Sequence, residues 1–264
     1  MNKQEVKEAV LKANCALKLD RKIVGVKFLF TQEEFEKAEA KKLEVKMPYC
    51  VMVKVGMTGK AIKASFENFG CLSSARALGV LEIDEMVSSG RHYNKLGLYQ
   101  DLATSKNVQN NMTMCKHRAY GVMIKPVEEY DENPDVVLII TNPYNAMRII
   151  QGYTHIYGCN SSYKMIGNQA VCSECTAYPF ESNNINVSLL CSGTRFMGGW
   201  GDDEMGIGLP FNKFISVVDG LYATLNLTEP NKKKLVIESR LKEQNRTDLE
   251  IVYDKNYYTG LYLK

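Results

Sequence analysis

Four of the eight cysteines in this 264-residue chain stand in turns where a thiol can do chemistry. They are spaced Cys50-x20-Cys71-x100-Cys172-x18-Cys191. Cys71 and Cys172 each stand where a helix is expected to begin, and the unpaired amides of a helix N-terminus stabilise a thiolate. Thiolates bind soft metals and iron–sulfur clusters. The pattern therefore predicts a metal or redox site, although its spacing is not that of a ferredoxin.

The remaining cysteines carry weaker signals. Cys172-x2-Cys175 is a single CxxC pair, which leaves a thioredoxin-like redox motif open, whereas a zinc ribbon needs a second pair. Cys15, Cys115 and Cys159 are expected to be small buried core residues. The chain has only three histidines, too few for a histidine-rich catalytic metal site, and we assign them no role.

Three charged residues lie close in sequence to the cysteine turns. Arg195 stands shortly after Cys191 and could hold a substrate carboxylate or phosphate through paired hydrogen bonds, or form a surface ion pair. Glu204, in an acidic loop, and Glu174, between two cysteines, are candidate general acids or bases. Their structural alternatives are a solvated loop and charge complementarity at a helix N-terminus. Trp200, among glycines, suggests a mobile cover outside the core.

Composition is that of an ordinary globular protein and argues against several functions. The formal net charge of +3 is too small to indicate nucleic-acid binding, and the run Lys232-Lys233-Lys234 is expected to be a solvated face. The N-terminus lacks the apolar segment of a secretory signal, and no run approaches the about 20 apolar residues that span a bilayer. We therefore expect a cytoplasmic protein with no membrane role, in a reducing compartment where thiols stay free or bind metal.

The elements that must position the thiols follow from hydrophobic patterns, which predict an α/β fold with α+β as the alternative. Buried strands are predicted over residues 23–30 and 135–141, a further strand over 120–125 and a weak strand over 61–66. Helices are predicted over residues 3–18, from 32, from 48, over 72–79, 98–108, 142–158 and 210–225. The helix from residue 32 should begin with a capping box of Thr31 and Glu34.

Short similarities within the chain suggest an internal duplication. The run from Pro48 resembles the run from Pro143, Cys71 resembles Cys172, and the Ser-Gly turn at Ser89 resembles the turn at Cys191. Equivalent turns of two related halves would face each other across a shared cleft and bring four thiols to one point.

This duplication defines the expected domain organisation. One α/β domain over residues 1–229 would contain two pseudo-symmetric halves, about residues 20–115 and 130–225. Residues 230–264 are charged, tyrosine-rich and strand-like, and are expected to form a C-terminal appendage.

The same residues are similar to the family catalogued as domain of unknown function 169, found in archaea and anaerobic bacteria. The resemblance covers about residues 20–225, and its cysteines stand where Cys50, Cys71, Cys172 and Cys191 stand here. The other matches are Ile23 to Phe30, Ser89-Gly90, Asp135-Val136-Val137, Pro143, Ala146-Met147-Arg148, Ser192 to Arg195, Asp203-Glu204-Met205 and Gly208-Leu209-Pro210. The chain departs from the family at Cys175, which weakens the thioredoxin-like interpretation, and in the C-terminal appendage. The resemblance supports the choice of residues more than the choice of reaction.

Three functions remain open. The first is an iron–sulfur protein with one [4Fe–4S] cluster on the four cysteines, acting as an anaerobic oxidoreductase, lyase or electron-transfer component. If one cysteine is not a ligand, the iron without a cysteine could act as a Lewis acid on a substrate, while Arg195 and Glu204 orient the substrate and transfer protons. The second is a cofactor-free enzyme with Cys172 or Cys191 as nucleophile. The third is a binding module for zinc or a small ligand. We expect a small-molecule substrate or a redox partner protein, and a homo-oligomer stays open.

Overall fold

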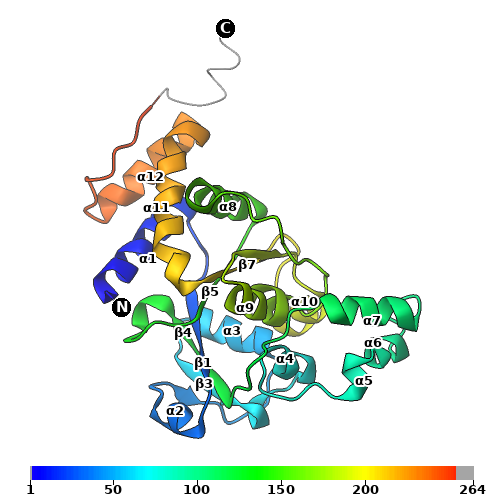
Figure 1. Cartoon of the computed structure of the whole chain (residues 1–264). Coiled ribbons are helices and arrows are strands. Elements are labelled where there is room, and N and C mark those ends of the chain that lie inside the picture. Colours follow the sequence, from blue (N-terminus) through cyan, green and yellow to red (C-terminus); the bar gives the residue numbers. More distant parts are fainter. Residues whose placement is uncertain (1, 254–264) are drawn as a thin grey trace.

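The computed structural model describes residues 2–253, which fold around one seven-stranded mixed sheet (Figure 1). The strands, in spatial order, are β2 (Lys41–Lys42), β3 (Ile62–Ser65), β4 (Gly121–Pro126), β1 (Val24–Leu29), β5 (Val136–Thr141), β7 (Met205–Pro210) and β6 (Asn186–Ser188). The central strand β1 runs antiparallel to both of its neighbours, and among the strands of residues 2–253 the pair β2 and β3 alone is parallel. The predicted mixed fold of helices and strands is confirmed.

Three long helices cover one face of the sheet: α1 (Lys3–Leu17), α8 (Pro143–Tyr157) and α11 (Phe211–Thr228). The backbones of α8 and α11 approach closely, because a Cβ on Gly220 would lie 2.2 Å from the carbonyl oxygen of Gly152. Strand residues such as Val137 and Ile207 complete this core. No helix within residues 2–253 has both the length and the apolar character to cross a membrane.

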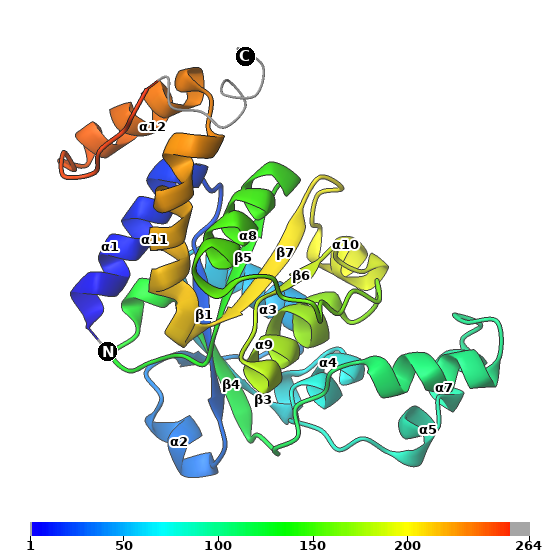
Figure 2. The same ribbon diagram turned by 45° about the horizontal axis from the view of Figure 1, so that its top comes forward.

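The opposite face carries shorter helices and all four turn cysteines. These elements are α3 (Tyr49–Met57), α4 (Leu72–Ala77), a π-helix η3 (Ala170–Ala177), α9 (Tyr178–Ser182) and α10 (Ser192–Gly198). Figure 2 shows α3, α9 and α10 on the side of the sheet away from α1 and α11. Their core is separate from that of the long helices and includes Tyr49, Met52, Leu78, Leu138 and Trp200.

A helical arm projects from this second face. It consists of α5 (Glu85–Ser88), α6 (Arg91–Lys95) and α7 (Leu102–Asn111). Figures 1 and 2 show α5 and α7 beyond the edge of the sheet. The hydroxyl of Ser105 donates to the Gly90 carbonyl oxygen at 2.5 Å, and Gly90 has a φ of 80° beside the backbone of Lys106. This contact holds α6 against α7, so that Tyr93 of α6 can reach back to the cysteine face.

Several local predictions are confirmed. Thr31 and Glu34 form the capping box of α2 (Gln32–Lys37). The side chain of Asn142 accepts from the amide of Asn145 at the start of α8, and Gly158 ends that helix with a φ of 74°. Two short 3-10 turns, η1 (Phe66–Asn68) and η2 (Val127–Glu129), complete the connections.

The prediction for the C-terminal segment is wrong over its first part. Residues Asn231–Glu243 form helix α12 instead of strand, because Lys, Glu, Arg and Leu are good helix formers. Lys234 is fully buried instead of solvated, and its ammonium donates to the carbonyl oxygens of Asn226 and Val252 at 2.6 and 2.7 Å. The last part of the predicted appendage, residues 254–264, lies outside the described residues.

The internal duplication is not confirmed in the form predicted. The runs from Pro48 and Pro143 begin α3 and α8, which cover opposite faces of the sheet and are not equivalent. Cys71 is the N-cap of α4, whereas Cys172 lies inside a π-helix. Sequence similarity between Pro-Tyr helix starts therefore reflects a shared local signal for helix initiation and not a shared position.

Candidate metal centre

One cavity of about 170 Å³ on the second face is lined by Cys50, Cys71, Cys172 and Cys191. The four residues come from α3, the start of α4, the π-helix and the start of α10. Among residues 2–253, no Lys, Arg, Asp or Glu lines this cavity. The cavity is therefore rich in sulfur, and the imidazole of His92 is its basic side chain.

The first two thiols are brought together by a backbone contact between two segments. The amide of Gly70 donates to the carbonyl oxygen of Met47 at 2.9 Å, and Met47 also forms a β-bridge with Phe69. A Cβ on Gly70 would lie 3.1 Å from the Met47 carbonyl carbon, so the close approach favours glycine. This contact places Cys71 beside the first turn of α3, which carries Cys50.

The other two thiols are held together by Glu174, which is 1% exposed behind Cys172. Its carboxylate accepts from the hydroxyl of Ser188 on β6 and from the amide of Ile166 at 2.6 Å. The Asn186 side chain donates to the Glu174 carbonyl oxygen at 2.9 Å. The π-helix is thereby fastened to the strand that leads to Cys191.

A third link connects the two pairs of thiols. The ammonium of Lys54 on α3 donates to the carbonyl oxygens of Gly198 and Gly199, at the end of α10, at 2.7 and 2.8 Å. Trp200 is 4% exposed between Arg21 and Lys54, whose cationic groups lie 4.8 and 5.0 Å from its ring centroid. The prediction that Trp200 is a mobile cover is wrong, because this residue is part of the core.

Burial and mutual repulsion disfavour free thiolates in the cavity. Burial raises the pKa of Cys50 to about 11, with a smaller contribution from the charge of Cys191. The pKa of Cys172 is raised well above its usual range, first by burial and then by the charges of Cys71, Cys191 and Cys50. The sulfur of Cys191 accepts from the Thr194 amide at 3.3 Å. A bound cation would supply the charge that the wall of the cavity lacks.

The thiols of the cavity do not form a ready-made site for a single ion. Within residues 2–253, no group of three or more His, Cys, Asp and Glu side chains is placed to hold one metal ion. Thiolates that share one zinc at about 2.3 Å each must lie in contact with one another. A [4Fe–4S] cluster binds each thiolate to a different iron, so its four sulfurs stand further apart.

The predicted acid, base and anion-binding residues do not line this cavity. The guanidinium of Arg195 donates to the carbonyl oxygens of Leu189, Gly201 and Glu204, so it holds the loop that follows α10. Glu204 forms an ion pair with Arg21 and accepts from the Gly201 amide at 2.5 Å. Together with the buried Glu174, these residues shape the elements that carry Cys172 and Cys191.

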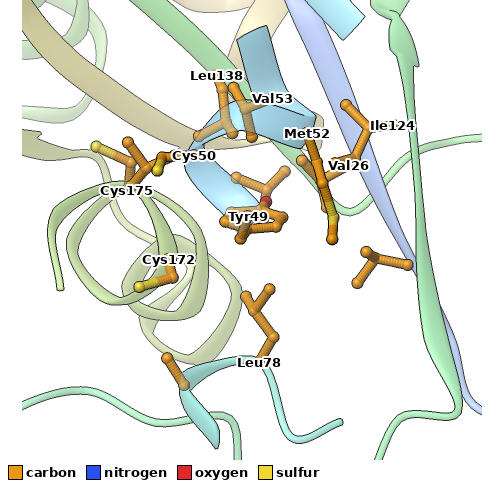
Figure 3. Close-up of a cluster of buried hydrophobic side chains, with 14 of the residues drawn as sticks. Val26, Tyr49, Cys50, Met52, Val53, Leu78, Ile124, Leu138, Cys172 and Cys175 are labelled. Carbon is orange, nitrogen blue, oxygen red and sulfur yellow. The ribbon is translucent and has the colours of Figure 1, made fainter. Parts of the chain in front are cut away.

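Other sequence predictions have mixed outcomes. Cys15 and Cys115 are buried as predicted, whereas Cys159 is exposed in the loop after α8. Cys172 and Cys175 share the π-helix, but only Cys172 lines the cavity, and Cys175 packs onto β7 beside Gly206. Figure 3 shows Cys50, Cys172 and Cys175 in the same cluster of buried side chains. The pair does not follow a strand directly, which removes the context of a thioredoxin-like motif.

Sequence reasoning missed the polar residues of the cavity wall, His92, Tyr93, Asn168 and Gln169. The nitrogen Nε2 of Gln169 donates to the Tyr93 hydroxyl, which joins the π-helix to the helical arm. The only local signal was the position of Asn168 and Gln169 a few residues before Cys172. No local signal singled out His92 or Tyr93.

Comparison with known proteins agrees with the resemblance in the sequence. A family model described as domain of unknown function 169, an uncharacterised ArCR, matches residues 12–220. An uncharacterized protein of Methanocaldococcus jannaschii is 25% identical over 223 residues, which cover 84% of this chain and 95% of that protein. No solved structure matches the chain. Because the family model covers most of the described residues, this chain belongs to the family of domain of unknown function 169.

Proposed function

We propose that this chain is a cytoplasmic iron–sulfur protein in which Cys50, Cys71, Cys172 and Cys191 hold one [4Fe–4S] cluster. The observation that carries the proposal is that thiols from four separate segments line one cavity whose wall, within the described residues, has no Lys, Arg, Asp or Glu side chain. A [4Fe–4S] cluster would supply electron transfer there, so the proposed activity is that of an oxidoreductase or an electron-transfer component.

The chain's own residues would bind the cluster and shield it. Two thiols are almost fully buried, since Cys50 and Cys172 are each 8% exposed, while Cys71 and Cys191 are half-buried at the rim. The amide of Thr194 donates to the Cys191 sulfur, and such hydrogen bonds raise the potential of a cluster.

Anaerobic purification of the native protein tests the proposal. We expect a brown protein that absorbs near ~400 nm and contains about four irons and four sulfides per chain. Replacing Cys172 by Ser should lower the iron content to well below one cluster per chain. Replacing Cys159 by Ser is the matched control, because that thiol is exposed and does not line the cavity. An iron-free wild-type protein, or equal iron in both variants, would refute the proposal, and stoichiometric zinc would favour a zinc module instead.

A cofactor-free thiol enzyme is the second candidate, and the surroundings of Cys191 favour it over Cys172 as nucleophile. Cys191 is half-buried and its sulfur accepts an amide hydrogen bond, whereas burial raises the pKa of Cys172 well above its usual range. In metal-free protein, iodoacetamide should then modify Cys191 much faster than the similarly exposed Cys71. Equal rates at the two thiols would exclude this candidate.

A further inference from the structure

The wall of the thiol cavity carries two polar side-chain atoms without a hydrogen-bond partner in the described residues, and a cluster can pair with only one of them. Gln169 is 5% exposed and lines the cavity together with Asn168 and Tyr93. Its Nε2 donates to the Tyr93 hydroxyl, but its oxygen Oε1 has no hydrogen-bond partner within the described part of the chain. The amide nitrogen Nδ2 of Asn168 is also buried and unpartnered among these residues. One acceptor and one donor therefore stand free beside the thiols.

The free acceptor restricts what can occupy the site. The sulfides of a cluster accept hydrogen bonds, so they can satisfy Nδ2 of Asn168 but not Oε1 of Gln169. A buried acceptor without a partner is costly, and such atoms are rare in folded proteins. Oε1 of Gln169 consequently requires an N–H or O–H group from a molecule in the cavity.

The charge of the cavity restricts the occupant further. Within residues 2–253, the wall offers no Lys or Arg to a carboxylate or phosphate and no Asp or Glu to an ammonium group, and the imidazole of His92 is its basic side chain. Arg195, the sequence candidate for an anion, is already engaged by three backbone carbonyl groups. Burying an unpaired ion is much less favourable than burying a neutral polar group. A neutral occupant fits this wall.

We propose that the cavity binds a small uncharged molecule with an N–H or O–H group, which donates to Oε1 of Gln169 while Nδ2 of Asn168 donates to the molecule. Such a molecule is the substrate class for the proposed iron–sulfur site, and in this respect the inference rests on the proposed function. The exposed side chains of Leu96 and Met197 form the apolar rim through which it enters.

Binding of three probes of nearly equal size tests this proposal on anaerobically purified full-length protein. Acetamide carries an N–H group, acetone lacks it, and acetate is anionic. Ligand-observed NMR titration should give saturable acetamide binding, with acetone weaker by about tenfold, which is the loss of one buried hydrogen bond. Acetate should not bind measurably. Equal affinity for acetamide and acetone, preferred binding of acetate, or no saturable acetamide binding overturns the proposal, and the last result assigns the free acceptor to water.

A pair of matched variants tests whether acetamide binds at Gln169. Gln169→Met keeps the side-chain length without the amide and should weaken acetamide binding about tenfold. Gln109→Met is the control, because Gln109 is also 5% exposed with an unpartnered Oε1 but lies in α7 away from the cavity. Unchanged affinity in Gln169→Met, or an equal loss in Gln109→Met, overturns the proposal. Gln169→Asn is the substitute if Met at a φ of 52° prevents folding, since Asn tolerates this conformation and is too short to keep the contact.

Iron analysis of the same samples separates this inference from the proposed function. If the protein contains iron but does not prefer acetamide to acetone, only the ligand proposal is refuted. Acetamide selectivity in iron-free protein refutes the cluster and leaves the ligand site standing. Iron retained in Gln169→Met together with weakened acetamide binding supports both.

Discussion

Replacing Lys54 by Met should loosen the helix that carries Cys191 without unfolding the protein. Lys54 lies on α3, the helix of Cys50, and its ammonium donates to the carbonyl oxygens of Gly198 and Gly199 at 2.7 and 2.8 Å. These carbonyl groups belong to the end of α10, and the ammonium also lies 5.0 Å from the ring centroid of Trp200. Met keeps most of the aliphatic stem and removes all three polar contacts.

The size of the effect follows from the exposure of each contact. A hydrogen bond to a charged group contributes about 1.5–3 kcal/mol when it is shielded. Only the bond to Gly198 is partly buried, and the bond to Gly199 is exposed, so the exposed bond contributes much less. The contact with Trp200 adds about 0.5–1 kcal/mol. We therefore expect α10 to lose about 2 kcal/mol, which raises the population of its opened form about 30-fold.

Native-state hydrogen exchange measures this opening directly. Amides of residues 192–198 should exchange about 30-fold faster in Lys54→Met, while those of the central strand β5 should keep their protection. Lys60→Met is the control, because Lys60 is exposed just after α3. If Lys54→Met and Lys60→Met show the same protection over residues 192–198, the proposed clamp between α3 and α10 does not exist.

Three further predictions concern buried contacts. Burial raises the pKa of Glu174, so the folded state favours the neutral carboxyl group, and the free energy of unfolding should fall as pH rises above about 4.5. Urea unfolding of Glu174→Gln should show a smaller decline of this free energy between pH 4.5 and 7 than the wild type. The ion pair of Arg148 and Glu229 is almost fully buried at 2.6 Å, and Glu229→Ala should lower the free energy of unfolding in urea by about 3–5 kcal/mol. A Cβ on Gly208 would lie 1.8 Å from the carbonyl oxygen of Cys175, so Gly208→Ala should destabilise the fold by more than about 3 kcal/mol, visible as a lower midpoint of thermal unfolding.

Elements that depend on local chemistry were predictable from the sequence. The capping box of Thr31 and Glu34 and the Asn142 cap both involve residues only a few positions apart, and β1 is an apolar run interrupted by Lys27 alone. The π-helix was not predictable, because it depends on close packing against the glycines of β7. Strands β2 and β6, of two and three residues, are too short for a hydrophobic period to identify them.

The candidate site likewise has a part that the sequence predicted, the cysteines, and a part that it did not, the polar side chains. The cysteines stood out by residue type and by their position at helix starts, and the four chosen ones line one cavity. Closeness in sequence to the cysteines was a poor guide to the polar residues of the cavity. Arg195 and Glu204 lie near the cysteine turns, but Arg195 donates to the carbonyl oxygens of Leu189 and Glu204, and Glu204 pairs with Arg21. Gln169 and Tyr93 are 76 positions apart and meet only because the helical arm folds back.

The four thiols come in two pairs, one from the segment that follows β1 and one from the segment that follows β5. Strands β1 and β5 lie side by side, with β4 and β3 outside β1 and with β7 and β6 outside β5. Cys50 and Cys172 each lie in the first turn of a helix on the same face, and Cys71 and Cys191 are each the N-cap of the helix that follows β3 or β6. Two thiols therefore follow β1 in the chain and two follow β5, whereas a [4Fe–4S] cluster takes four. The proposed cluster site is complete only when β1 and β5 pair, so cluster loading and the pairing of these two strands should stabilise each other.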